Sequence, residues 1–121
     1  MIAAALAVLG VYGFRNRSDH TYEGGFIAMS DAIREPRLWD LVTRAGGSSV
    51  VLSVPGTYPP KPLNGVMVSC FLTPSLESKY TYPASLRDEI ADVVGEYIFD
   101  TKDFRTDDKD YLLGQVYEMT N

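Results

Sequence analysis

The sequence predicts an α/β fold, and two observations support this prediction. A helical apolar pattern in residues 36–45 ends at paired glycines and is followed at once by the short β-branched apolar run 50–54. A helix, a glycine turn and a strand covered on both faces form an α/β unit. A second strand pattern at 66–72 and a second helical pattern at 83–94 continue the alternation. We therefore expect α/β organisation along most of the chain.

Composition limits the range of functions. The chain has 121 residues, 45% of them hydrophobic and 12% aromatic, which is enough for one globular domain or part of one. A net charge of −5 argues against general binding to a nucleic-acid backbone, which requires clustered Lys and Arg. The single cysteine, Cys70, excludes an intrachain disulfide framework and a cysteine-based zinc cluster. A reducing, cytoplasmic setting is predicted.

The apolar run at residues 2–9 superficially resembles a signal peptide. It has no preceding basic region and no clear small-residue cleavage site before Arg15. The run is also too short to span a bilayer as a helix. It is predicted to form a buried strand or helix, and no membrane partner is expected.

The next elements follow from local signals. Residues 15–25 are polar and contain paired glycines, which favours a loop, and residues 26–29 suit a short strand. A helix is expected at 36–45, because proline suits its first turn and glycines supply its end. Its predicted core face comprises Leu38, Leu41, Val42 and Ala45.

Residues 55–65 contain four prolines and two glycines between the two predicted strands. Proline fixes φ and removes a hydrogen-bond donor, so this segment cannot be a helix or the interior of a strand. A stiff connection directly after a buried strand is where α/β proteins commonly place binding groups. Four residues of this segment carry polar side chains that could bind a ligand: Thr57, Tyr58, Lys61 and Asn64. A purely structural crossover is the alternative interpretation.

Two further helices are predicted towards the C-terminal end. The first covers 83–94 and stops at Gly95; its core face comprises Leu86, Ile90, Val93 and Val94. A brief apolar stretch at 97–99 follows. The second helix is expected to begin near Thr106 as its N-cap. Its predicted core face comprises Leu112, Leu113, Val116 and Tyr117.

Candidate binding residues near the beginning of the chain are cationic. Arg15, Arg17 and His20 lie within six residues and could hold an anionic group, because guanidinium matches phosphate geometry. With Tyr22, the two arginines could instead serve a small nucleotide-binding domain. An ordinary solvated loop is the structural alternative. His20 is the only histidine, and no nucleophilic Ser or Cys stands beside it in a recognisable motif.

Acidic residues gather before the last helix: Asp100, Asp103, Asp107, Asp108 and Asp110. The spacing does not fit an EF-hand, because the tight-turn glycine is missing and Tyr111 stands where a bidentate Glu is needed. Helix capping and a solvated surface explain this cluster. No metal-binding residue is therefore predicted within the chain.

Several segments, taken together and in order, resemble a known family. They are residues 57–69, 71–75, 13–17, 38–41, 80–83, 95–97 and 104–110. The sequence from Gly10 onwards resembles the phosphohydrolase/phosphomutase branch of the type I phosphodiesterase/nucleotide pyrophosphatase proteins, in the alkaline phosphatase superfamily. Residues 1–9 do not match, and Leu9 stands where that family usually has His.

The resemblance implies an α/β/α sandwich around a mixed sheet and metal-dependent hydrolysis or transfer of phosphate esters. It also implies divalent metal ions, zinc or manganese, and a phosphorylated small molecule as substrate. In that family the nucleophile and first metal-binding Asp lie upstream of the matched region, and the other Asp and His ligands lie downstream. No catalytic or metal-binding residue can therefore be carried over to this chain.

Residues 1–121 are accordingly expected to form a single partial domain, with 10–121 as the central segment of a phosphohydrolase that is inactive alone. The alternative is a binding or assembly module that completes its fold with a partner chain or as an oligomer. Under the first interpretation, the candidate substrate-binding residues are Arg15, Arg17, His20, Tyr22, Thr57, Tyr58 and Asn64.

Overall fold

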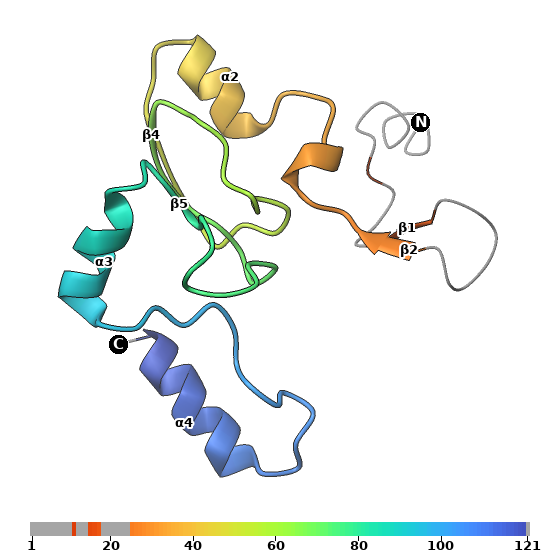
Figure 1. The fold of residues 1–121 in the computed structure, drawn as a ribbon, viewed down its shortest axis with the longest axis vertical. Helices are drawn as coiled ribbons and strands as arrows, with labels where there is room; N and C mark the ends of the chain where they lie inside the picture. Colours follow the sequence, from red (N-terminus) through yellow and green to blue (C-terminus); the bar gives the residue numbers. More distant parts are fainter. Residues whose placement is uncertain (1–10, 12–14, 18–24, 121) are drawn as a thin grey trace.

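The computed structural model describes residues 11, 15–17 and 25–120. Within these residues the chain forms an α/β fold with three α-helices and a three-stranded mixed sheet, accompanied by a two-stranded hairpin (Figure 1). The predicted α/β class is confirmed. The prediction of a buried element at 2–9 lies outside the described residues.

The three-stranded sheet contains β3 (Ser49–Leu52), β4 (Gly65–Val68) and β5 (Thr81–Tyr82), in the order β3-β4-β5. β3 runs parallel to β4, and β4 runs antiparallel to β5. Met67 of β4 pairs with Val51 on one side and with Tyr82 on the other. The buried core cluster therefore forms around Met67, with Val51 and Leu63.

The parallel pairing of β3 and β4 explains the proline-rich segment. Parallel neighbours need a connection of about a dozen residues or more, because the chain must return to the same end of the sheet. Residues 53–64 supply this connection. The segment is therefore a crossover between parallel strands and not a hairpin partner, as the sequence predicts.

β3 lies where the sequence predicts a strand, but its faces are less covered than predicted. Val51 is buried, whereas its neighbours Val50 and Leu52 are 72% and 58% exposed. Alternate residues of a strand point to opposite faces, and β3 is an edge strand of the described sheet. The prediction that β3 is covered on both faces is therefore wrong for the described part of the chain.

The helices lie where periodicity predicts them, but their core faces are largely uncovered. They are α2 (Leu38–Arg44), α3 (Leu86–Val94) and α4 (Lys109–Thr120), and none of them contains a buried residue. Leu38 is 74% exposed and Val93 is 82% exposed. In α2 it is Trp39, not Leu38, that packs against the core. The predicted burial of these helix faces is therefore wrong within the described residues.

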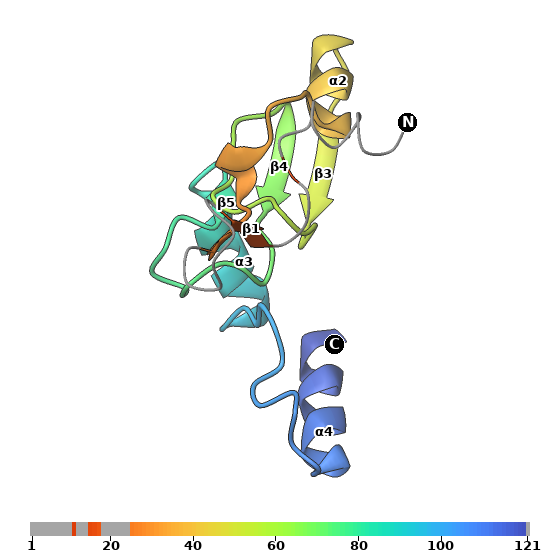
Figure 2. The same ribbon diagram turned by 90° about the vertical axis from the view of Figure 1, so that its right-hand side faces the viewer.

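α4 begins later than predicted. The carboxylate of Asp108 accepts a hydrogen bond from the Tyr111 backbone N–H at 3.0 Å, which is the contact of an N-cap side chain. Thr106 instead accepts a 3.3 Å hydrogen bond from the Asp108 N–H, before the helix. Figures 1 and 2 both show α4 extending away from the sheet beyond the end of α3.

The N-terminal hairpin pairs β1 (Arg15–Arg17) with β2 (Gly25–Ile27) in antiparallel register. The loop predicted for residues 15–25 is wrong at 15–17, where cross-strand pairing orders a polar tripeptide. A single 3-10 turn, η1 (Ser30–Ala32), follows β2. None of the described helices is long and apolar enough to cross a membrane.

Candidate functional site

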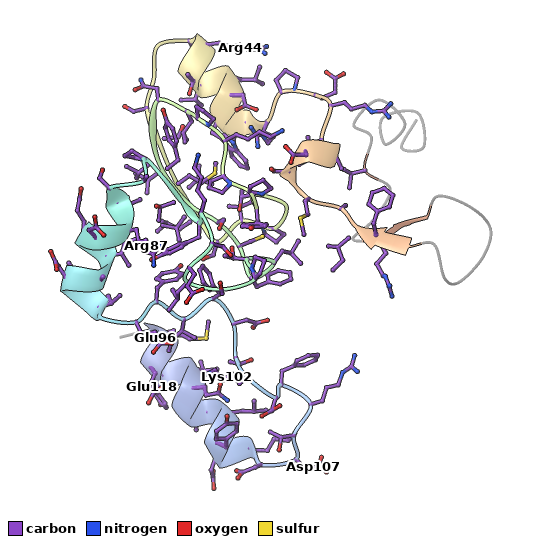
Figure 3. The ribbon with its side chains drawn as sticks, viewed as in Figure 1. Arg44, Arg87, Glu96, Lys102, Asp107 and Glu118 are labelled. Atoms are coloured by element: carbon purple, nitrogen blue, oxygen red, sulfur yellow. The ribbon has the colours of Figure 1, made fainter. Side chains whose placement is uncertain are left out.

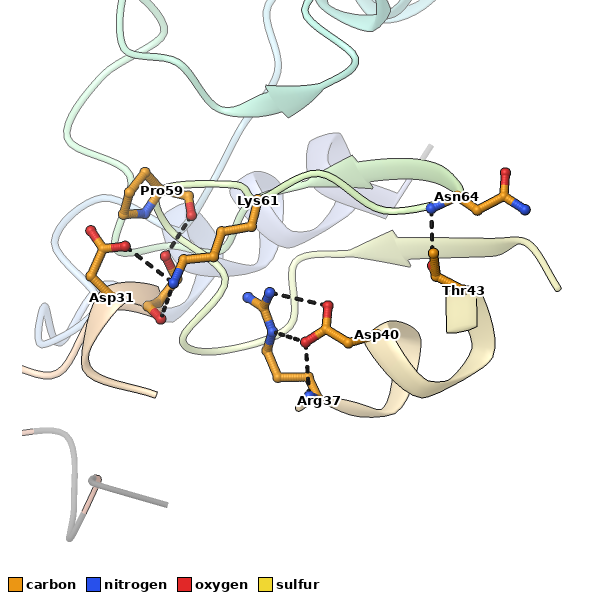
Figure 4. A network of polar contacts seen from close by, with 8 residues as sticks. Asp31, Arg37, Asp40, Thr43, Pro59, Lys61 and Asn64 are labelled. Carbon is orange, nitrogen blue, oxygen red and sulfur yellow. Dashed lines mark hydrogen bonds and ion pairs between the residues drawn. The ribbon is translucent and has the colours of Figure 1, made fainter. Parts of the chain in front are cut away.

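The proline-rich crossover is fastened to the turn that follows β2 (Figure 4). The backbone N–H of Ser30 donates to the Tyr58 carbonyl at 2.8 Å, and the Ser30 hydroxyl donates to the Pro59 carbonyl at 2.6 Å. Lys61 Nζ donates to the Ser30 carbonyl at 3.0 Å and pairs with Asp31 at 3.2 Å. These contacts join segments about thirty residues apart and fix the position of the loop.

The same loop encloses the thiol of Cys70, just after β4. Burial alone would raise the pKa of this thiol, and Cys70 is fully buried. Hydrogen bonds from the backbone N–H groups of Leu72, Thr57, Gly56 and Tyr58 outweigh that effect. Together they lower the pKa of Cys70 below its ordinary value. The loop backbone therefore creates a site that favours the thiolate.

Two of the predicted loop residues use their side chains to hold the crossover. Thr57 is buried and its hydroxyl donates to the Val54 carbonyl at 2.7 Å. Asn64 lies at the other end of the loop, where its side-chain amide donates to the Gly47 carbonyl at 2.9 Å. The Asn64 N–H donates to the Thr43 hydroxyl at 3.0 Å. These contacts favour the structural interpretation of Thr57 and Asn64.

The predicted cationic group is described only in part. Arg15 and Arg17 lie on β1, and Arg15 is exposed. His20 and Tyr22 lie outside the described residues. The structure therefore groups Thr57 and Tyr58 beside Cys70, and the joint placement of the four N-terminal residues stays a prediction.

A basic pocket of about 230 Å³ lies where the segment before α2, α2 itself and the crossover meet. Its charged lining comprises Arg34, Glu35, Arg37, Asp40, Arg44 and Lys61. Sequence reasoning did not single out this pocket. Arg34, Arg37 and Arg44 lie close together in the sequence, before and at the end of α2, but Lys61 joins them only through the fold.

Arg37 and Asp40 form a well-oriented pair in this pocket (Figure 4). Arg37 Nε and its backbone N–H each donate to Asp40 Oδ2 at 2.8 Å, and Nη2 donates to Oδ1 at 3.2 Å. Burial raises the pKa of Asp40, but these hydrogen bonds and the charges of Arg37 and Arg44 outweigh it and lower that pKa below 3.8. Asp40 therefore stays ionised and orients the guanidinium.

Ser53, at the carboxyl end of β3, has an unusual backbone conformation. Its φ is 52°, in the left-handed region that residues other than glycine seldom occupy. Its hydroxyl lies 2.9 Å from the Tyr97 hydroxyl, beside a pocket of about 490 Å³. Glu96 and Glu118 also line this pocket (Figure 3). No local sequence signal distinguished Ser53 from an ordinary strand-end residue.

The family resemblance implies divalent metal ions whose ligands lie outside the matched region. Among the residues that the structure describes, no three His, Cys, Asp or Glu side chains are placed to hold a metal ion. We therefore derive no catalytic step through a metal from these residues.

Comparison of the chain with protein-family models, curated proteins and solved structures finds no match.

Proposed function

We propose that this chain supplies part of a metal-dependent phosphohydrolase of the phosphodiesterase/nucleotide pyrophosphatase kind. The observation that carries the proposal is the position of residues 57–69, where the sequence resemblance is densest. They contain the tethered crossover and β4, next to the carboxyl ends of two parallel strands. In open α/β sheets, ligands bind outside these strand ends. The complete enzyme would be an α/β/α sandwich.

The division of roles follows from the residue types present. The substrate would be a phosphorylated small molecule, contacted by Arg15, Arg17, His20 and Tyr22. Thr57 and Tyr58 would keep the crossover in place beside it, and Asn64 would hold the far end of the crossover against Thr43 and Gly47. The nucleophile and the residues that bind zinc or manganese would come from outside this chain, which contains one histidine in total. The proposed compartment is the cytoplasm.

This proposal predicts that the purified chain has no turnover alone. An aryl phosphodiester assayed with zinc or manganese should give the rate of the protein-free control. Metal-dependent hydrolysis that persists after contaminating phosphatases are removed would contradict the proposed division of roles.

The coding DNA on both sides of this chain provides the positive test. We expect an upstream frame with a Thr or Ser nucleophile and a downstream frame rich in Asp and His. A longer chain containing all three parts should hydrolyse the same diester in a metal-dependent way. Flanking frames without these residues would sink the proposal.

A second candidate function is an assembly module that covers its apolar surface with another chain. It is favoured by a groove of about 570 Å³ that includes Leu38, Val50 and Leu52, all of them exposed. Exposed apolar patches next to an edge strand are characteristic of association surfaces. Size-exclusion chromatography with light scattering tests this function, and a monomer at every concentration would count against it.

A further inference from the structure

The basic pocket beside α2 has a charge opposite to that of the molecule as a whole. The chain carries a net charge of −5, yet the pocket is lined by three arginines, one lysine and only two carboxylates. Asp40 is already matched by Arg37. Lys61 is paired with Asp31, so Arg34 and Arg44 are left with a single carboxylate in the lining, that of Glu35. This local excess of positive charge favours an anionic ligand.

Arg37 is held in place before any ligand arrives. Its side chain is 13% exposed, its Nε and Nη2 donate to Asp40, and its guanidinium lies 5.4 Å from the centre of the Trp39 ring. Nη1 is enclosed and has no hydrogen-bond partner among the described residues. A guanidinium that is oriented on one side and unmatched on the other can add an acceptor without losing much side-chain freedom.

Lys61 contributes a second anchored cation to the lining of the pocket. Figure 4 shows its ammonium group held by Asp31 and the Ser30 carbonyl. Lys61 uses two contacts, to the Ser30 carbonyl and to Asp31, whose side chain is 73% exposed. An ammonium group has three donors, so one remains for a ligand. The Lys61 contacts that hold the crossover in place therefore also hold a positive charge at the pocket.

The size of the pocket limits the ligand. About 230 Å³ is less than the roughly 300–1,000 Å³ of pockets that enclose drug-sized molecules. A phosphate group fits this space. Guanidinium groups match the oxygens of phosphate in geometry as well as charge. We propose that this pocket binds a phosphate group, either as inorganic phosphate or as the phosphoryl end of a small phosphomonoester.

This inference does not rest on the phosphohydrolase proposal, because it concerns binding by this chain alone and requires no turnover. Trp39 provides the readout, since it is the only tryptophan and its ring lies beneath Arg37. Inorganic phosphate is titrated into the labelled protein at constant ionic strength while the Trp39 indole N–H resonance is followed. We expect a saturable shift, and the same endpoint with methyl phosphate.

Matched charge variants locate the binding. Arg34→Gln and Arg44→Gln each remove an exposed cation from the pocket and should weaken phosphate binding by about tenfold. Lys102→Gln removes an exposed cation outside the pocket and should leave the affinity unchanged; Figure 3 shows Lys102 and Arg44 on distant parts of the molecule. Circular dichroism verifies that each variant is folded. If one of the two pocket variants does not fold, the other still tests the inference.

Three results would overturn the inference. The first is a shift that does not saturate, or that chloride reproduces at the same ionic strength. The second is an equal loss of affinity in Lys102→Gln, which would indicate a response to overall charge. The third is unchanged affinity in a folded pocket variant.

Discussion

At the scale of single residues, Cys70 shows how the fold gives a side chain its chemistry. The sequence indicates only that one cysteine is present. The structure encloses its thiol in backbone N–H groups from the crossover and from Leu72, so that hydrogen bonds overcome the effect of burial on the pKa. The thiol is therefore the group towards which these backbone N–H groups are directed.

Replacing Cys70 tests this role. Cys70→Ala should lower the free energy of unfolding by about 2 kcal/mol, because it leaves buried N–H donors without an acceptor. Cys70→Ser keeps an acceptor at the same position and should cost less. Denaturant unfolding at pH 7 measures both changes, and an equal loss in the two variants would contradict the role of the acceptor.

The pH dependence of stability gives a separate prediction for Cys70. Its pKa in the folded chain is below the ordinary value of 9.0, so the folded state loses the thiol proton first. The resulting stabilisation is fully present above the unfolded pKa and is lost as the pH falls through the folded pKa. The unfolding free energy should therefore rise towards pH 9 in the wild type. Neither variant should show this rise, and its persistence in Cys70→Ala would assign it to another group.

At the scale of elements, the β3–β4 pair depends on close approach at Gly65. Gly65 has a φ of 131° and pairs with Ser49 at the start of the parallel ladder. An added Cβ would collide with the Ser49 carbonyl oxygen. A side chain at this position would therefore separate the strands that the crossover connects.

Two glycine substitutions test whether the close approach at Gly65 stabilises the fold. Gly65→Ala should lower the free energy of unfolding by about 3 kcal/mol, because backbone atoms must move. Gly114→Ala is the control, since Gly114 lies within α4 and an added Cβ meets nothing within 4 Å. It should raise stability by about 0.5–1 kcal/mol. Urea unfolding compares the two, and a loss of similar size in both would contradict the steric explanation.

The elements also show what could be predicted from the sequence. Apolar periodicity and glycine stops located α2 and α3, and β-branched runs located β3 and β4, because those signals are local. β5 has two residues and β1 is a polar tripeptide, so only pairing with a partner strand defines them. The basic pocket was missed for the same reason, since Lys61 joins the arginines of its lining only through the crossover. The burial of the apolar helix faces was predicted least well, because it depends on which other parts of the chain pack against each helix.

At the scale of the whole molecule, the described chain has more apolar surface than its own core can cover. Among the described residues the buried core cluster comprises Val51, Leu63 and Met67, and the three helices expose much of their apolar surface. A chain of 121 residues normally buries about two-thirds of the surface that it exposes when unfolded. The uncovered groove at β3 is therefore the best candidate surface for a second copy of this chain.

We therefore expect self-association that depends on concentration and on β3. In light scattering after size exclusion, the wild type should shift from monomer to larger species as its concentration rises. Val50→Lys should reduce this shift, because it places a charge on the exposed side of the edge strand without touching the core. Val93→Lys is the matched control, since Val93 is even more exposed but lies on α3, away from the groove. Equal effects of the two lysines would mean that association is non-specific, because a β3 interface should discriminate between them.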